Sequence, residues 1–176
     1  MGLFLVKEIK SKAGELHFRR WRFLETPWFG IYLHYIAKAD EDKHPHDHPW
    51  SFVGIILWGG YEEFVCVPDF RGLGIKPEGK AWGLSWRGFY RLPPKNGGFR
   101  PSMETVNTPG TISYRSATGI YHQITRLLKP TWTLVFHGPK RPGYGPDGRI
   151  NWGYFTDDGW MDHETYRQEK RKGRWD

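Results

Sequence analysis

The chain has 176 residues, of which 38% are hydrophobic and 26% charged, and this size suits a single domain over residues 1–176 with a hydrophobic core. Its 22 glycines and 13 prolines are spread along the whole sequence, which argues against a helical bundle. Its 10 tryptophans, 9 tyrosines and 11 phenylalanines exclude a disordered or coiled-coil chain, because such chains lack the large apolar side chains that build a core.

Cysteine content and charge narrow the location and the partners. Cys66 is the single cysteine, which excludes an intramolecular disulfide framework and a multi-cysteine metal site and fits a reducing cytoplasm. No apolar run is long enough to span a bilayer, so no membrane partner is expected. The formal net charge is +7, but much of the excess lies in a basic tail over residues 162–174. A solvated tail is the favoured interpretation, and a nucleic-acid partner is the less favoured one.

Short segments rich in β-branched and aromatic residues recur between turn sequences, which predicts strands. The turns contain glycine and proline, and no stretch before residue 162 leaves room for a long helix. The sequence therefore predicts an all-β sandwich or barrel followed by one helix over residues 162–171. Residues 68–109 are interpreted as a pair of irregular strands or a lid over a site. The expected strands cover residues 16–24, 30–38, 50–58, 61–67, 88–92, 110–114, 122–128 and 131–137.

Three histidines at successive spacings of two form the most informative pattern. They are His44, His46 and His48 in KHPHDHPWSF. Side chains two apart on a strand share a face, so two adjacent imidazoles of this set can bind one metal ion at about 2.1 Å each. Asp47 then points to the opposite face and is expected to fix the local backbone rather than bind metal. A solvated, histidine-rich turn is the alternative, because the flanking prolines suit strand edges.

A third metal ligand has to come from another strand. His122 begins an alternating run, and a Lys-Pro turn at residues 129–130 predicts that this run forms a hairpin with residues 131–137. A lone histidine at a strand start is more often structural than a ligand. Beside a cluster that lacks a third partner, His122 becomes the leading candidate.

Two blocks of the sequence resemble the cupin superfamily, and within it the three-histidine, cysteine dioxygenase-like group. HDHPWSFVGIILWGGYEE is similar to the first cupin motif, and GIYHQITRLLKPTWTLVFHGP is similar to the second. The resemblance implies a double-stranded β-helix, the cupin or jelly-roll barrel, with His46, His48 and His122 as metal ligands. His44 would then lie outside the motif, at the barrel mouth. The alternative register pairs His44 with His46 and leaves His48 as a bystander.

The sequence also departs from the cupin pattern. Many cupins add a glutamate ligand a few residues after the HxH pair, where this chain has Pro-Trp-Ser-Phe, so the site would hold three histidines unless Glu62 or Glu63 reaches it. The animal-type thiol dioxygenases carry a cysteine and a tyrosine at positions that correspond here to Val53 and His137. Oxidation of cysteine is therefore not the expected reaction, and Cys66 is interpreted as a small buried hydrophobe.

The resemblance suggests a metal and a set of supporting residues. Fe(II) is the first expectation for the metal, because similar three-histidine cupins use it, while imidazole ligands also suit Zn, Ni, Mn or Cu. His137 and Tyr121 are the predicted catalytic side chains, with a satisfied core histidine as the alternative for His137. The predicted substrate-binding residues are Arg126, Arg115 and Trp50. Trp50, Trp58 and Tyr121 are the candidate pocket walls, with plain core packing as the alternative.

Several functions follow from these residues. The first is a metal-binding cupin that acts as a non-haem iron dioxygenase or oxygenase on a small molecule, with an anionic substrate as one option. The second is a non-catalytic cupin that holds a metal or a small ligand. The third is a sugar isomerase or epimerase that uses acid–base catalysis. Action on nucleic acid through the stretch RGLGIKPEGKAWGLSWRGFYRLPPK is less favoured, and a homodimer stays open.

Overall fold

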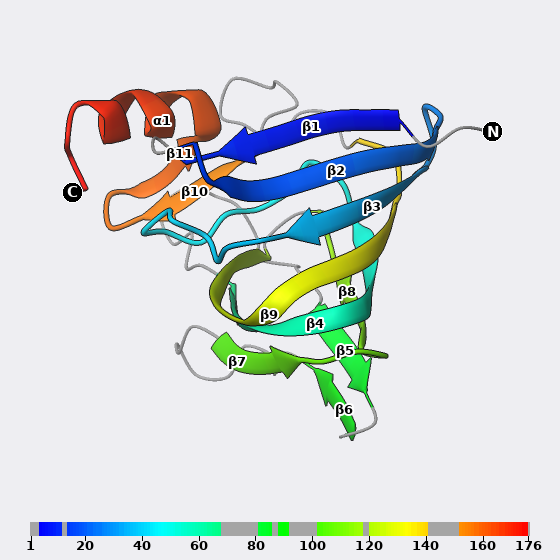
Figure 1. The fold of residues 1–176 in the computed structure, drawn as a ribbon. Helices are drawn as coiled ribbons and strands as arrows, with labels where there is room; N and C mark the ends of the chain where they lie inside the picture. The colour runs from blue at the N-terminus through cyan, green and yellow to red at the C-terminus, as the bar shows by residue number, and fades with distance from the viewer. Residues whose placement is uncertain are drawn as a thin grey trace.

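The computed structural model describes residues 4–11, 14–67, 81–85, 88–91, 102–117, 120–140 and 152–175. Within these ranges the chain forms strands followed by one short helix at the C-terminal end (Figure 1). The strands are β1 (Phe4–Lys10), β2 (Leu16–Glu25), β3 (Gly30–Ile36), β4 (Phe52–Cys66), β5 (Ala81–Ser85), β6 (Gly88–Arg91), β7 (Ser102–Asn107), β8 (Ile112–Arg115), β9 (Tyr121–His137), β10 (Gly153–Thr156) and β11 (Gly159–Asp162), and the helix is α1 (His163–Arg171).

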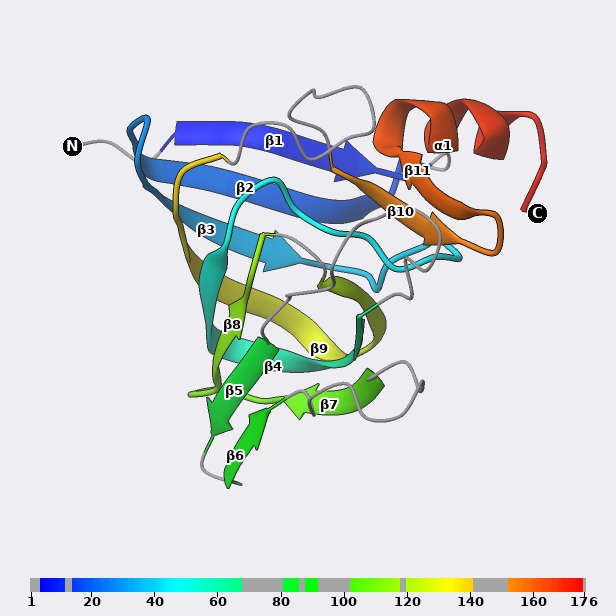
Figure 2. The ribbon, with the colours of Figure 1, turned by 180° about the vertical axis from the view of Figure 1, so that it is seen from behind.

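One strongly curved sheet contains most of the strands. Its order is β1-β2-β3-β9-β4-β8-β5-β6, and β7 pairs with the second half of β4. The long strands β4 and β9 run antiparallel and form the centre of this sheet, while β10 and β11 make a separate hairpin beside α1 (Figures 1 and 2). The predicted fold class is confirmed in its main feature: the described residues form an all-β structure with a short C-terminal helix.

The central strands bend together, and this corrects the hairpin predicted from the Lys-Pro pair. Residues 121–137 form the single strand β9, so Pro130 lies inside a strand. Opposite it, Gly59 and Gly60 of β4 have positive φ angles of 81° and 146°, and the β4–β9 pairing shifts register around them. Proline lacks a backbone N–H, and it is tolerated here because the ladder is already interrupted by the irregularity. The predicted break between residues 50–58 and 61–67 is likewise a bend within β4.

The other predicted strands agree with the structure to different extents. The segments at residues 16–24, 30–38 and 110–114 correspond to β2, β3 and β8. Strand β1 was not predicted, because its short apolar run soon returns to charged residues, and it lies at the edge of the sheet beside β2. Part of the ambiguous region at residues 68–109 forms β5, β6 and β7, while residues 68–80, 86–87 and 92–101 lie outside the described residues.

The C-terminal helix is confirmed, with its start at His163. The Asp162 side chain caps it by accepting hydrogen bonds from the backbone N–H groups of Glu164 and Thr165 at 3.0 and 3.1 Å. Its one buried residue, Tyr166, stacks on Tyr154 of β10 with ring centroids 3.7 Å apart. Through this stacking contact the helix packs against the β10–β11 hairpin. Among the described residues, no helix is long and apolar enough to cross a membrane.

Alternating side chains of β4 and β9 face the interior of the curved sheet. Tyr61, Glu63 and Val65 of β4 are all buried, as the two-residue period of a strand requires when one face covers the core. On β9, Ile124 packs with Tyr61 in one hydrophobic cluster. A glutamate in such a row has to be compensated by other polar groups, and its partners define the candidate site.

The bend of β4 gives a stability prediction. Ala in place of Gly59 would put a Cβ 2.4 Å from the carbonyl oxygen of Pro130, at a φ of +81°, so we expect a loss of more than about 3 kcal/mol of unfolding free energy. Gly110 has a similar φ of +84° but open space around it, so Gly110→Ala should cost only about 1 kcal/mol. Urea unfolding measures both changes, and equal losses would contradict a sterically fixed bend.

Candidate metal centre

Three imidazoles converge inside the curved sheet. The potential ligand atoms of His46, His48 and His122 lie within 4.8 Å of one another, and the Nε2 atoms of His48 and His122 are 2.8 Å apart. Two nitrogens bound at about 2.1 Å to one ion at a right angle would be about 3 Å apart. The three side chains therefore fit a shared metal ion with little rearrangement.

Backbone pairing brings two of these histidines together. His46 and His122 exchange backbone hydrogen bonds of 3.0 and 2.8 Å, forming an isolated antiparallel bridge. Apart from this bridge, the segment that carries His46 and His48 is not part of a strand, in contrast to the regular strand assumed from the spacing. Asp47 faces the other way, is buried, and accepts a hydrogen bond from the Gly153 N–H at 2.7 Å. The backbone-fixing role predicted for Asp47 is therefore observed.

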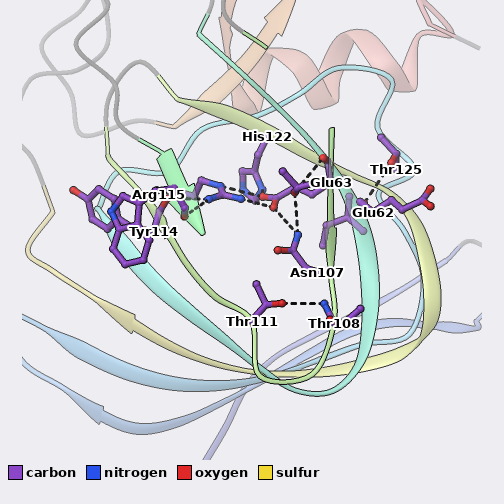
Figure 3. A network of polar contacts seen from close by, with 12 residues as sticks. Glu62, Glu63, Asn107, Thr108, Thr111, Tyr114, Arg115, His122 and Thr125 are labelled. Atoms are coloured by element: carbon purple, nitrogen blue, oxygen red, sulfur yellow. Dashed lines mark hydrogen bonds and ion pairs between the residues drawn. The ribbon is translucent and has the colours of Figure 1, made fainter. Parts of the chain in front are cut away.

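A buried carboxylate orients the third histidine. Oε1 of Glu63 lies 2.8 Å from Nδ1 of His122 (Figure 3). An ionised carboxylate only accepts hydrogen bonds, so the hydrogen sits on Nδ1 and the Nε2 lone pair faces the other two imidazoles. Carboxylate–histidine pairs of this kind fix the ring of metal-binding histidines and raise their basicity.

Glu63 is itself compensated by two further side chains. Arg115 donates from Nη2 to Oε2 at 2.5 Å and from Nε to Oε1 at 3.2 Å, and Asn107 donates from Nδ2 to Oε2 at 3.0 Å (Figure 3). Burial alone would raise the pKa of Glu63, but the charge of Arg115 and the hydrogen bond from His122 lower this pKa to about 2. Glu63 therefore stays ionised across the physiological range.

The imidazoles of His46 and His48 are held in the neutral form, which binds metal. Burial, followed by the nearby His122, lowers the pKa of His46 to about 4. Burial, His122, His46 and Arg20, in that order, hold the pKa of His48 well below its usual value. Neutral imidazoles have a free lone pair for a metal. Nδ1 of His46 is also buried without a hydrogen-bond partner among the described residues, which fits a site whose full set of partners includes a metal ion.

The three histidines line a cavity of about 790 Å³. Trp50, predicted as a wall and substrate contact, does line it and stacks on His48 with ring centroids 6.2 Å apart. The cavity wall also includes Arg20 of β2 and His34 of β3, which sequence reasoning missed. A volume of this size accommodates a small-molecule ligand.

Neither of the two arginines predicted to bind substrate lines the cavity. Arg115 lies behind Glu63 and is 1% exposed, so it positions the carboxylate and does not line the cavity. Arg126 forms an exposed ion pair with Glu62 on the outer face. The expected alignment of Arg126 with His122 fails because the β4–β9 pairing shifts register between Glu62 and Glu63, and one extra residue reverses which face a side chain occupies.

The two predicted catalytic side chains also lie away from the cavity wall. Tyr121 is fully buried on the opposite face of β9 from His122 and packs with Cys66. His137 is buried between Tyr32 and Trp50, with its Nε2 close to the backbone of Gly30. The candidate wall residue at position 58 is 63% exposed, so its indole ring does not form the pocket.

His44 is separate from the three-histidine group. Its Nδ1 is 3.2 Å from the Tyr166 hydroxyl of α1, and it is not among the cavity residues. This placement matches the register that pairs His46 with His48. Cys66 is buried in a small apolar cluster, as its interpretation as a small hydrophobe predicted.

Comparisons with known proteins find similar structures but no family. No protein-family model matches the chain, and no curated protein matches it. Hydroquinone 1,2-dioxygenase from Sphingomonas sp. TTNP3, solved with 4-hydroxybenzoate bound, is 10% identical, with a TM-score of 0.41 over 66% of this chain and 63% of its own. A sugar phosphate isomerase from a cupin superfamily, from Silicibacter pomeroyi, is 16% identical, with a TM-score of 0.38 over 82% of this chain and 74% of its own. Vicilin from Corylus avellana is 10% identical, with a TM-score of 0.45 over 89% of this chain and 36% of its own. The chain thus spans less than two thirds of the length of the dioxygenase and of vicilin.

The buried ion pair behind the site gives a second stability prediction. Arg115→Met is expected to lower the unfolding free energy of the metal-free protein by about 3–5 kcal/mol, because Glu63 would remain as an uncompensated buried charge. Arg126→Met removes the arginine of the neighbouring, exposed pair with Glu62 and should change stability little. Urea unfolding at neutral pH compares the two, and similar losses would contradict the structural role of Arg115.

The same pair predicts a pH dependence. Because the folded-state pKa of Glu63 is lowered to about 2, its stabilisation is fully present above the ordinary glutamate pKa of about 4.3 and is lost as the pH falls toward 2. In Arg115→Met the pKa of Glu63 should rise, because the guanidinium no longer offsets its burial. The pH profile should therefore shift: the acid-side loss shrinks or disappears, and the stability deficit relative to the wild type narrows as the pH falls and Glu63 takes up a proton. Unfolding curves between pH 2 and 7 measure the shift, and superimposable profiles would contradict it.

Proposed function

We propose that this protein is a metal-dependent enzyme of the non-haem iron type, a dioxygenase or oxygenase that acts on a small molecule inside the cavity. The observation that carries the proposal is the convergence of His46, His48 and His122 on one wall of a cavity of about 790 Å³. The chemistry of this donor set suits Fe(II), while Zn, Ni, Mn and Cu also accept imidazole ligands.

The three histidines would hold the ion, which would supply Lewis acidity, open coordination positions and, as Fe(II), the one-electron chemistry that reactions with O₂ require. Glu63 keeps His122 in the tautomer whose Nε2 is free, and Arg115 keeps Glu63 ionised. Trp50 and Phe52 flank His48 with their rings and restrict the access of water. The chain thereby fixes the ligand geometry and leaves the rest of the cavity for substrate.

The ligand set is tested by metal content across five histidine variants. Replacing His46, His48 or His122 with alanine removes one of three imidazoles, so each change should abolish stoichiometric metal while the barrel stays folded. His44→Ala and His137→Ala serve as buried-histidine controls and should keep metal near the wild-type level. Metal analysis and circular dichroism on the same samples check this prediction. Equal retention in all five variants would overturn the metal site.

Oxygen chemistry is tested separately. Protein reconstituted anaerobically with Fe(II) should consume O₂ only when a substrate from a panel of small molecules is added, and chelation should stop the uptake. Absence of any substrate-dependent uptake in iron-loaded protein would instead favour a non-catalytic binding protein. Turnover that survives chelation or the removal of O₂ would favour an isomerase or epimerase.

A further inference from the structure

The charges that line the cavity are unequally compensated. Among the described residues, three of the five acidic groups of the wall pair with a lysine or an arginine. Glu8 pairs with Arg19 and Lys10, Asp42 pairs with Lys170, and Glu63 pairs with Arg115. Of the other two acids, Asp40 accepts a hydrogen bond from the Ile124 N–H, and Glu41 lies 3.7 Å from Nδ1 of His17, an ion pair only when that imidazole is protonated.

Several cations of the same wall form no ion pair within the described ranges. They come from three elements and are Lys7 of β1, Arg20 of β2, and Arg167 and Arg171 of α1. Cations that share one wall repel one another unless an anion lies between them. Burial lowers the pKa of Lys7, and the charges of Arg20 and Arg167 lower it further, as expected for a group close to both of these arginines.

Arg20 is held in this cationic wall by a hydrogen bond and by two aromatic rings. Its Nε donates to Nε2 of His34 at 2.9 Å, and its guanidinium lies over the rings of Tyr32 and Phe18 at 5.0 and 5.5 Å. The ring contacts and the Nε hydrogen bond fix the plane of the guanidinium. The two terminal NH₂ groups remain for a ligand, and this fork geometry matches a carboxylate or a phosphate.

We infer that the cavity binds the phosphate or phosphonate group of a small molecule, with Arg20 as the anchor and Lys7 and Arg167 as the further cations. This inference rests on the proposed function, because it names the substrate class of that same cavity. A dianion is favoured over a carboxylate because one negative charge would leave most of the cationic wall uncompensated. The cavity volume of about 790 Å³ selects a small molecule over a polymer.

Inorganic phosphate and acetate are the probes that test the anion class. Isothermal titration of metal-loaded wild-type protein should show phosphate binding at least about tenfold more tightly than acetate, because more charge-assisted hydrogen bonds form. The same titration on His46→Ala, which is expected to lack metal, should retain phosphate binding. That result would place the anion on the cationic wall rather than on the metal.

Substitutions of the cationic wall residues test whether Arg20 anchors the phosphate. Arg20→Met keeps an unbranched side chain against the rings and should weaken phosphate binding by at least about tenfold, as expected for the loss of hydrogen bonds to a charged group. Lys7→Met and Arg167→Met should weaken it severalfold. Arg126→Met, an exposed arginine outside the cavity, is the charge-matched control and should bind like the wild type.

The outcomes separate this inference from the metal proposal. Wild-type protein that binds metal but binds phosphate no better than acetate would overturn the phosphate inference and leave the metal site standing. If Arg20→Met and Arg126→Met weaken phosphate binding equally, the role of Arg20 as the anchor would be overturned, because the loss would then reflect net charge alone. Selective loss of phosphate binding in Arg20→Met, with metal content near wild type, would support the inference even if no oxygenase activity is found.

Discussion

The site depends on one buried carboxylate. Glu63 lies in the interior row of β4, where an unpaired charge would be costly, and three side chains share its two oxygens. Arg115 neutralises the carboxylate, Asn107 donates a further hydrogen bond, and His122 donates through Nδ1. The same contacts that make the charge tolerable also set the orientation of the metal-facing imidazole, so core stability and ligand geometry are coupled.

The bend of the central strands brings these groups together. Gly59 lets β4 turn against Pro130 of β9, and on one side of this bend the second half of β4 pairs with the first half of β9 (Figure 2). Glu63 lies in that half of β4 and His122 in that half of β9. The backbone bridge between His46 and His122 then brings the loop that carries His46 and His48 against this part of the sheet. Elements separated by more than 70 residues thereby form one compact centre.

The sequence predicted the local part of this arrangement and missed the part set by strand register. The spacing of two left open whether His44 or His48 pairs with His46, and the resemblance to the cupin motifs implied the set His46, His48 and His122. These signals need only a few neighbouring residues. The roles of Glu63 and Arg126 depend on a register shift in the β4–β9 pairing, which no local pattern encodes. Similarly, nothing in LHFRRWRF distinguishes Arg20 from its neighbouring arginines, since only the packing of β2 shows which one lines the cavity.

A crystal structure of the metal-loaded protein, with anomalous scattering measured at the metal edge, tests the central claim most directly. The account predicts one ion bound by His46, His48 and the Nε2 atom of His122, with Nδ1 of His122 still hydrogen-bonded to Glu63. Nitrogen ligands should lie at about 2.1 Å. Direct coordination by Glu63, or an ion bound through Nδ1 of His122, would contradict the role assigned to the buried carboxylate.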